Sequence, residues 1–519
     1  MRRRPALLTG LAAVAVLAAA TGLYALLRDD GPPPPPERPP SEPRPGAPPY
    51  AVDAFQPFFY YRSDDAELLA RGARGQAHVV YALSPGGVRA SVRRSVRWRD
   101  EVERAVLGTD VDPDYLEAML FLESAGRPHV MADGTPNSAT GLMQILPGTA
   151  TDLLGMHVDV GRSIEIQRAL ARNRRRAVLA RKPKRRRAAR RKVRALRRER
   201  NVVDERFDPE KALAGAVTYL TKATRRFGRA DLAITSYHMG IGNLESVIAR
   251  YVSPRAVART TRRTVARFGI TWPRLYYDSS PVRNPRTWKF LSSLGDDSKH
   301  YLFKVEASRE ILRLSREDPD ELAERIELQT AKASAEEFLR PESEYGPYED
   351  AEALREAYAR SELVPLPSDP RRLGYRIGLG MGELSRRVEQ PRILYRGLRR
   401  EALACLLFIA KEHRRMAGEA WRPLRVTSTV RDLPYQELLV ATNIQATSEY
   451  SLHTTGFAVD VAKPRAEGPL RFLLERLQAL DVISWVEEPG AFHFTVGPRA
   501  KALMPLYEAL VVDRRPVFR

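Results

Sequence analysis

The spacing of apolar residues changes near residue 365 of the chain. Between about 97 and 308 apolar positions recur mainly at helical intervals, and the charged stretch 306–358 follows the same rule. Further on, helical runs such as REALACLLFIAKEHRRM alternate with short strand-like runs such as LRVTSTV, GFAVDVA and AFHFTV. The sequence therefore predicts an α+β multidomain chain, in which a mainly α domain precedes a small α+β domain.

An uncharged apolar segment, residues 5–27, follows the N-terminal MRRR. As a helix it would span about 30 Å of hydrocarbon, and the three arginines before it favour a cytoplasmic N-terminus and an exported remainder. We therefore expect an N-terminal transmembrane helix. Small residues at 18–20 leave a cleaved signal peptide, and hence secretion, as the alternative.

Composition shifts mark further boundaries. Gly31 to Pro49 is rich in proline and predicts an extended spacer. The pattern does not decide the structure of the region after it. The expected organisation is an anchor at 1–28, a linker at 29–50, a connecting region at 51–96, a first domain at 97–308 with a basic insertion at 162–200, a charged helical spacer at 309–365 and a last domain at 366–519.

The charge of the chain is strongly positive. It contains 85 Lys and Arg against 64 Asp and Glu, a net charge of +21, which indicates an anionic partner. Export from the cytoplasm argues against nucleic acid. Between Arg162 and Arg200, 19 residues are Lys or Arg and only Glu165 and Glu199 are acidic. This segment, a helix or a helical hairpin interrupted near Pro183, is either a solvated insertion or a clamp for an anionic polymer or lipid surface.

The stretch DPDYLEAMLFLESAGRP contains the first candidate chemical group. Asp112 can cap a helix, and Glu123 lies at helical spacing from Leu116, Met119 and Leu120, at the end of the core-facing stripe. A carboxyl half inside an apolar wall has a raised pKa and can serve as a general acid near neutral pH. The alternative is a helix-terminal glutamate that pairs with Arg127.

Two later segments add to this motif. ATGLMQILPGTA (139–150) and AITSYHMGIGN (233–243) follow in order, with RFDPEKALAGAVTYL before the second and DSKHYLFKVEAS after it. Together with ESAGRP they resemble the soluble lytic transglycosylase family. The resemblance implies a lysozyme-like fold. It also implies cleavage of the glycan strand of peptidoglycan between N-acetylmuramic acid and N-acetylglucosamine, in the bacterial cell envelope on the periplasmic side.

The resemblance also implies residue roles. Glu123 matches the single acid/base, which protonates the leaving oxygen and then deprotonates the muramyl 6-hydroxyl to give a 1,6-anhydro product. The matching positions of the sugar groove are Ser124, Met143, Gln144, Tyr237, His238 and Asn243. His238 stands where the family usually has asparagine. An insertion at 271–290 adds aromatic residues and arginines, which either stack on sugars or pack in the core.

The stretch SLHTTGFAVD contains the second candidate group. His453 and Asp460, with His493 in the strand-like run AFHFTV, supply the three protein ligands that a catalytic zinc site needs. Taken alone, a histidine near an aspartate, such as His453 and Asp460, is more often a hydrogen-bonded pair than a metal site. The pattern Ser-x-His-x-x-Gly-x-Ala-x-Asp, with RVTSTVRDLPYQ (425–436) upstream, resembles the M15 family of zinc D-alanyl-D-alanine carboxypeptidases.

This second resemblance implies Zn²⁺ as a cofactor, bound by His453, Asp460 and His493. Arg431 matches the arginine that orients substrate and polarises the carbonyl, and Ser451 is a further substrate-binding candidate. The family's general-base glutamate stands three residues before the last histidine, where this chain has Gly490. We expect Glu488 in that role, with Glu487 next. If neither reaches the water, the domain binds stem peptide without cutting it.

Both resemblances indicate the same polymer as partner. The sequence therefore predicts a bifunctional peptidoglycan remodelling enzyme that cuts the glycan and the stem peptide. A transglycosylase with a peptide-binding C-terminal domain and a non-catalytic envelope scaffold are the alternatives. Anionic envelope polymers or lipids are the expected partners of residues 162–200 under the clamp interpretation. The lone Cys405 forms no internal disulfide.

Overall fold

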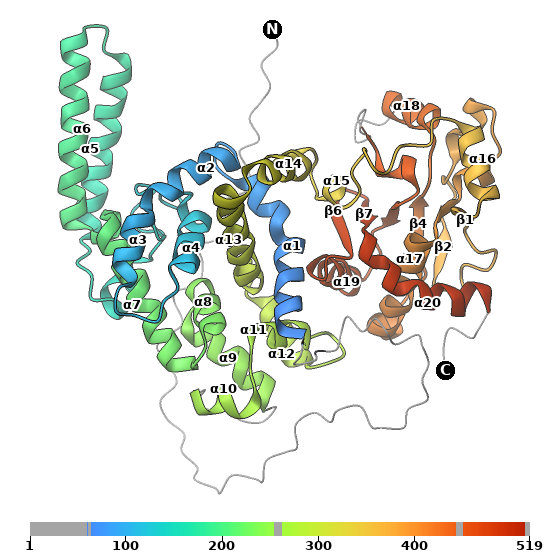
Figure 1. Cartoon of the computed structure of the whole chain (residues 1–519), viewed down its shortest axis with the longest axis horizontal. Helices are drawn as coiled ribbons and strands as arrows, with labels where there is room; N and C mark the ends of the chain where they lie inside the picture. Colours follow the sequence, from blue (N-terminus) through green and yellow to red (C-terminus); the bar gives the residue numbers. More distant parts are fainter. Residues whose placement is uncertain (1–59, 61–63, 254–261, 443–449, 514–519) are drawn as a thin grey trace, which may run out of the picture. The chain divides into compact units, whose positions relative to one another are not determined.

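The computed structural model describes residues 60, 64–253, 262–442 and 450–513, which form two compact units (Figure 1). The first unit contains residues 89–271 and 292–301, and the second contains residues 60–88, 272–291 and 302–513, in each case as far as they are described. The expected anchor at 1–28 and the proline-rich linker at 29–50 lie outside the described residues. Among the helices that are described, none is long and apolar enough to cross a membrane.

The first unit is helical, as predicted for this part of the chain. Two of its helices begin with an aspartate cap followed by proline: the Asp112 and Asp208 side chains accept hydrogen bonds from the Asp114 and Lys211 amides. The elements are α2 (Val88–Ser95), α3 (Arg99–Val106), α4 (Pro113–Ser124), α5 (Val160–Leu179), α6 (Pro183–Val203), α7 (Pro209–Phe227), α8 (Ala230–Met239), α9 (Ile241–Val252) and α10 (Arg262–Phe268).

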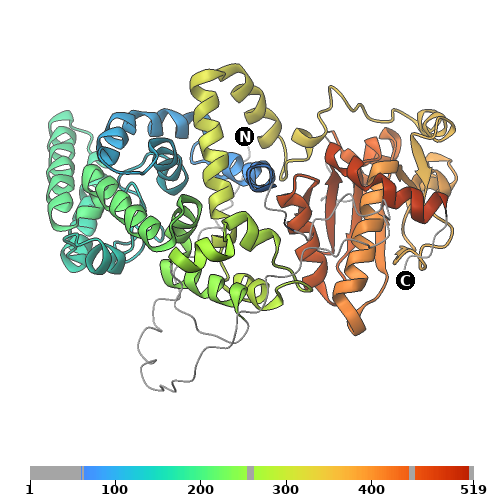
Figure 2. The ribbon, with the colours of Figure 1, turned by 60° about the horizontal axis from the view of Figure 1, so that its bottom comes forward.

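The apolar stripe of α4 is buried. Leu116, Met119 and Leu120 are each 0% exposed, which confirms the core-facing spacing read from the sequence. The basic segment is a hairpin of two helices, α5 and α6, that lie side by side in Figures 1 and 2. Pro183 opens α6, so the predicted interruption is confirmed at that residue.

The second unit contains a five-stranded sheet in the order β2-β4-β5-β7-β6. Only β2 and β4 pair in parallel, and the other neighbours are antiparallel. A two-stranded ribbon joins β1 and β3. The strands are β1 (Leu363–Pro365), β2 (Tyr375–Ile377), β3 (Gly397–Arg399), β4 (Leu424–Ser428), β5 (Ala458–Ala462), β6 (Ile483–Glu487) and β7 (Ala491–Val496).

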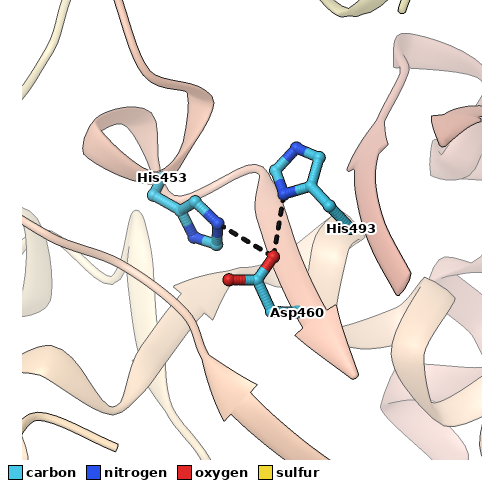
Figure 3. Close-up of side chains that lie close together, drawn as sticks. All are labelled: His453, Asp460 and His493. Carbon is cyan, nitrogen blue, oxygen red and sulfur yellow. Dashed lines mark hydrogen bonds and ion pairs between the residues drawn. The ribbon is translucent and has the colours of Figure 1, made fainter. Parts of the chain in front are cut away.

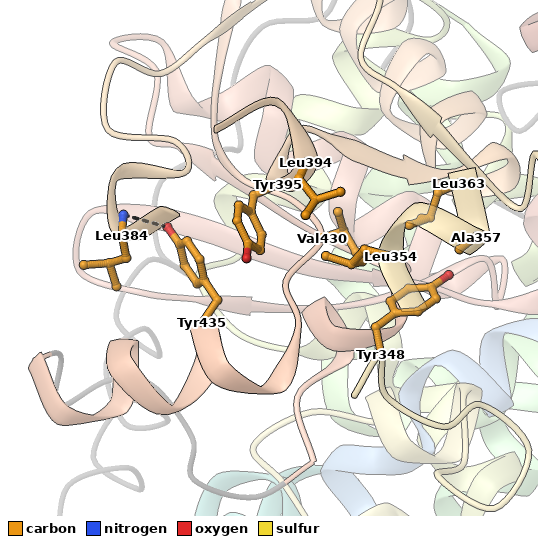
Figure 4. Close-up of a cluster of buried hydrophobic side chains, with 9 residues drawn as sticks. All are labelled: Tyr348, Leu354, Ala357, Leu363, Leu384, Leu394, Tyr395, Val430 and Tyr435. Carbon is orange, nitrogen blue, oxygen red and sulfur yellow. Dashed lines mark hydrogen bonds between the residues drawn. The ribbon is translucent and has the colours of Figure 1, made fainter. Parts of the chain in front are cut away.

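Side chains of opposite character alternate across this sheet. Val459, Val461, Phe492 and Phe494 are fully buried on one face, where α17 (Arg400–Ala417) packs against β5 and β7. The opposite face carries polar side chains of the same two strands. A second buried cluster lies under α16 (Ala351–Ala359) and α18 (Leu433–Thr442), as Figure 4 shows. Its members are Tyr348, Leu354, Ala357, Leu363, Leu384, Leu394, Tyr395, Val430 and Tyr435.

Further helices complete the second unit. They are α1 (Asp65–Leu83), α11 (Trp272–Tyr277), α12 (Pro285–Ser293), α13 (Tyr301–Glu317), α14 (Pro319–Thr330), α15 (Glu336–Leu339), α19 (Glu467–Ala479) and α20 (Met504–Tyr507). The first residue of α13, Tyr301, is assigned to the first unit.

The units do not follow the boundaries expected from the sequence. Residues 272–291, expected in the first domain, belong to the second unit because their aromatic side chains pack there. Trp272 is 0% exposed, and the Tyr277 hydroxyl donates to the Ala479 carbonyl at 2.6 Å. Trp272 and Tyr277 are therefore core residues. The segment expected as a spacer, 309–365, also belongs to the second unit.

Candidate functional sites

Glu123 lies in the last turn of α4, and the chain leaves this helix through a tight left-handed turn. Ala125 and Gly126 have φ angles of 50° and 72°. A Cβ on Gly126 would lie 2.5 Å from the Arg94 carbonyl carbon, so only glycine fits this close approach of two backbones. The Arg94 Nε donates to the Ala125 carbonyl at 2.9 Å. This packing fixes the helix end that carries Glu123.

Among the described residues, the carboxyl of Glu123 is hydrogen-bonded by Tyr301. The Tyr301 hydroxyl donates to its Oε1 at 2.6 Å, and the His238 ring stacks on Tyr301 with centroids 5.1 Å apart. Burial raises the pKa of Glu123 to about 7, against the lowering effect of the Tyr301 hydrogen bond. Arg127 instead donates to the Ser124 carbonyl, and no ion pair joins it to Glu123 in the described parts of the chain.

The second motif forms a loop held from beneath by a buried arginine. Arg206 donates to the Pro136, Ser138 and Ile145 carbonyls and forms an ion pair with Asp204; both side chains are 0% exposed. Gly141 has a φ of 80°, and a Cβ there would lie 1.8 Å from the Arg206 carbonyl oxygen. The glycine that opens the motif is therefore required by the packing of the loop on this arginine.

The candidate groove residues occupy different environments in the structure. Tyr237 donates from its hydroxyl to the Met143 carbonyl at 2.8 Å, which ties the third motif to the second. Met143 takes part in this link through its backbone, and its side chain is 0% exposed. Gln144 has a φ of 49°, and its Nε2 donates to the Gly141 carbonyl within the same loop.

Three further groove candidates complete this description. Ser124 is buried and donates to the Leu120 carbonyl. The His238 Nδ1 lies 2.8 Å from the Ser298 hydroxyl. Asn243 donates to the Met239 carbonyl at the junction of α8 and α9. His238 is linked to the acid through Tyr301, since its ring stacks on Tyr301, which contacts Glu123.

The second candidate site lies on the polar face of the sheet. Asp460 on β5 and His493 on β7 are directly opposed partners, so their side chains project to the same side. His493 Nδ1 lies 2.8 Å from Asp460 Oδ1, and His453 Nε2 lies 3.2 Å from the same oxygen (Figure 3). Residues separated by up to 40 positions in sequence thus converge on one carboxylate oxygen.

His453 enters this site from the short 3-10 helix 452–455, immediately before a glycine turn. Gly456 has a φ of 77°, and a Cβ there would lie 2.7 Å from Leu363 Cδ2. The glycine of the His-x-x-Gly spacing therefore lets the chain turn from His453 into β5. His453 Nδ1 donates to the Thr429 carbonyl at 2.8 Å, which leaves Nε2 to face Asp460.

The chemistry of these groups fits a metal ion. Burial lowers the pKa of His453, which favours the neutral imidazole that metal ions bind. Candidate ligand atoms of His453, Asp460 and His493 all lie within 4.8 Å of one another. Ligand atoms in a tetrahedral zinc site are about 3.3 Å apart, as its bond lengths require.

Charged neighbours surround the three side chains. Although burial opposes the charge on Asp460, the two histidines hold the pKa of this carboxyl well below its usual range. Arg431 is buried, donates to the Ser428 hydroxyl and lies 3.5 Å from Asp460 Oδ2. Ser451 is buried, and its carbonyl accepts from Thr454. Arg431 thus lies beside the predicted ligands, whereas Ser451 supports the turn that carries His453.

The structure distinguishes the two candidate general bases. Glu487 is exposed and forms ion pairs with Lys463 and Arg471, which hold its pKa at about 2. Glu488 follows it and is half-buried. Glu488 directly follows β6, and its amide donates to the Ala491 carbonyl, so the alternation that opposes Val486 to His493 continues to Glu488 and puts it on the same face. Burial, and then the Asp460 charge, raise the pKa of Glu488. Glu488 is therefore the candidate base that faces the histidines.

Two residues with defined roles in these sites were missed by the sequence reasoning. Tyr301 contacts Glu123, and Glu336 accepts from His493 Nε2 at 3.0 Å. Tyr301 lies in the segment that resembles the transglycosylase closing helix, which was a usable signal. Glu336 lies in the segment expected as a spacer, and nothing in its local sequence marks it.

Comparison with known families matches a part of the chain. Residues 186–256 match the transglycosylase SLT domain. This span contains α7, α8 and Tyr237, begins inside α6 and ends before the closing segment with Tyr301. Glu123 and the second motif lie outside it. No curated protein matches the chain. The match supports a transglycosylase that acts on the glycan strand of peptidoglycan.

Proposed function

We propose that this chain is a lytic transglycosylase whose acid/base is Glu123. The observation that carries the proposal is a half-buried carboxyl with a pKa of about 7, joined to Tyr301, on which His238 of the SLT match stacks. A group with this pKa can donate a proton near neutral pH and accept one later in the same cycle. Both steps are needed if one carboxyl serves the whole reaction.

The proposed reaction balances with one protein group. Glu123 protonates the glycosidic oxygen as its bond to the muramyl anomeric carbon breaks. The resulting carboxylate then removes the proton from the muramyl 6-hydroxyl, whose oxygen closes onto the anomeric carbon. Other glycosidases need a second carboxyl to activate water or to attack the sugar. Here an internal hydroxyl takes that place, so Glu123 ends each cycle protonated again.

Glu123→Gln tests this function. We expect the variant to lose 1,6-anhydro-muropeptide production by about 10²- to 10⁴-fold, the usual contribution of a general acid-base. Mass spectrometry of digested peptidoglycan measures the products. Glu210→Gln, at an exposed position of α7, is the matched control and should keep the parent activity. Anhydro products at parental levels from Glu123→Gln would refute the assignment.

We further propose that the C-terminal part of the chain is a zinc peptidase that cuts the stem peptide. The observation that supports it is the convergence of two imidazole nitrogens on Asp460, with Arg431 beside it. His453, Asp460 and His493 would hold the ion, and bound Zn²⁺ would supply a water with a pKa of about 7. Arg431 would orient the substrate carbonyl, and Glu488 would take the proton from the water.

Two measurements test the peptidase proposal. We expect the full chain to bind one zinc per molecule by elemental analysis, and we expect Glu488→Ala to keep the zinc but lose stem-peptide cleavage. Glu487→Ala is the control, because its carboxylate is held by Lys463 and Arg471. Zinc binding without cleavage by the parent would favour the alternative in which this domain only binds stem peptide.

The proposed location is the periplasmic side of the bacterial inner membrane, where both substrates occur. Residues 1–28 would anchor the chain there, with the proline-rich linker as a spacer. Cleavage of residues 1–28 would instead release the enzyme. Membrane fractionation of the expressed full chain, with N-terminal sequencing, decides between these two outcomes.

A further inference from the structure

The distal half of the α5–α6 hairpin has an unusual surface. Residues 171–194 contain 14 Lys and Arg and no Asp or Glu, and all 14 cations are exposed. The hairpin's apolar core, formed by Ile166, Leu170 and Leu196, lies nearer its base. The two acidic residues of the hairpin also lie near its base, where Glu165 and Glu199 pair with Arg162. The charges of the distal half are therefore not used to join the two helices.

The placement of these cations is unfavourable for the helices themselves. Lys184, Arg185 and Arg186 lie in the first turn of α6, where the helix dipole favours acidic side chains. Like charges spaced three or four residues apart also destabilise a helix. The fold thus gains nothing from this arrangement, and an external anion would relieve the repulsion.

The tip of the hairpin adds a second, independent feature. Val178 and Leu179 are 83% and 64% exposed at the end of α5. Arg181, Lys182 and Lys184 follow them directly in the short connection and the start of α6. Exposed apolar side chains next to clustered cations suit a lipid interface, where cations bind headgroup phosphates and apolar groups enter the acyl boundary. A soluble polyanion would use the cations alone.

We propose that residues 171–194 of the hairpin bind the surface of an anionic phospholipid bilayer, with Val178 and Leu179 inserted at the tip. The cations supply the attraction to the phosphates, and the two apolar side chains supply burial in the interface. This binding is independent of both proposed activities, since the hairpin contributes no residue to either site.

Vesicle binding of the full chain tests the proposal. The chain is mixed with vesicles of phosphatidylcholine alone, and with vesicles in which phosphatidylglycerol replaces part of it. Neutral vesicles measure whatever the N-terminal apolar segment contributes. The charge variant is Arg185→Gln, Arg186→Gln, Arg187→Gln, and the charge-matched control replaces the exposed Arg376, Arg386 and Arg387 by Gln. Val178→Ser with Leu179→Ser removes the apolar tip without changing the charge. Thermal unfolding by circular dichroism checks that each variant folds.

We expect the charge variant to bind anionic vesicles on the order of 100-fold more weakly, since each cation near a membrane contributes about 1 kcal/mol. The control should match the parent. The apolar variant should lose about 10-fold on vesicles while its binding to soluble polyphosphate stays unchanged. Unaltered vesicle binding by the charge variant overturns the proposal. So does an apolar variant that binds vesicles like the parent, because the hairpin would then be a site for soluble polyanions.

Discussion

At the scale of single residues, Glu123 is subject to two opposing influences. Burial raises its pKa to about 7, and the Tyr301 hydroxyl, which stabilises the carboxylate, lowers it. Removal of that hydroxyl in Tyr301→Phe should therefore raise the pKa of Glu123 further. The first proposed step needs protonated Glu123, so glycan cleavage falls as the pH rises through the pKa of this group. The alkaline limb of kcat/KM should therefore move to higher pH in Tyr301→Phe.

The control for this shift is a second buried tyrosine of the same unit. The Tyr219 hydroxyl donates to the Ser236 carbonyl rather than to Glu123, so Tyr219→Phe should leave the alkaline limb in place. A pH profile of glycan cleavage for the two variants gives the comparison. An alkaline limb that moves to lower pH in Tyr301→Phe would contradict the role assigned to this hydrogen bond.

Glu336 contributes to the second site through His493. Its carboxylate accepts from His493 Nε2 at 3.0 Å and from Thr495, which leaves His493 Nδ1 directed at Asp460. Carboxylates that orient a ligating histidine typically contribute 10- to 100-fold in metal affinity. We therefore expect Glu336→Gln to weaken zinc binding by about that factor, as measured by competition with a chromophoric chelator.

A neighbouring glutamate on the same helix provides the comparison. Glu337 pairs with Lys332, and no hydrogen bond joins it to His493 in the part of the chain that the structure describes. Glu337→Gln should keep the parent zinc affinity. Glu336→Asp, which retains the charge on a shorter stem, should recover part of the loss. Equal zinc affinity in Glu336→Gln and the parent would show that His493 needs no such support.

Tyr301 and Glu336 also show what could not be found from the sequence. Glu123, His453, Asp460 and His493 were found because each lies in a compact motif with a regular spacing. Tyr301 and Glu336 act across 178 and 157 residues of sequence, and only the fold brings them to their partners. Glu488 was preferred to Glu487 from the sequence, and the strand pairing that continues past β6 now adds a geometric reason for that choice.

At the scale of elements, the loop 136–145 depends on one buried ion pair. Arg206 holds three carbonyls of this loop and pairs with Asp204 in a site closed to solvent. Arg206→Ala should leave Asp204 buried without its charged partner, at a cost of about 3–5 kcal/mol. We expect a clear loss of thermal stability of the first unit and a loss of glycan cleavage, because Tyr237 bonds to the same loop.

Lys211→Ala is the contrasting variant for this prediction. Lys211 pairs with Glu205, close to Arg206 in sequence, but its side chain is exposed. Exposed pairs contribute little to stability, so the unfolding midpoint should change little. Calorimetry of the two variants makes the comparison. Similar midpoints for both would mean that the loop does not need the buried pair.

Helices and strands were more predictable than their assignment to units. The caps at Asp112 and Asp208 and the break at Pro183 are local signals, and each marks a helix start in the structure. Residues 272–291 contain no such local signal of the unit to which they belong. Their helical pattern continues that of the preceding segment, yet Arg476, far along the chain, donates to the Tyr276 and Tyr277 carbonyls. Packing partners of this kind are not encoded in local periodicity.

At the scale of the whole molecule, the two candidate sites share no residue. Glu123, Tyr301, Tyr237 and the loop around Gln144 belong to the first unit, whereas the two histidines and Asp460 belong to the second. The proposed glycan cleavage needs a proton donor alone, and the proposed peptide cleavage needs an ion. Removal of the ion should therefore separate the two activities within one protein.

We expect zinc chelation to abolish stem-peptide cleavage and to leave 1,6-anhydro products unchanged, while Glu123→Gln does the reverse. Mass spectrometry of one peptidoglycan digest reads both products at once, so each sample contains its own internal control. Restoration of peptide cleavage by added zinc distinguishes loss of the ion from damage to the fold. Loss of anhydro products on chelation would contradict the separation, because it would mean that glycan cleavage also depends on the metal or on the integrity of the second unit.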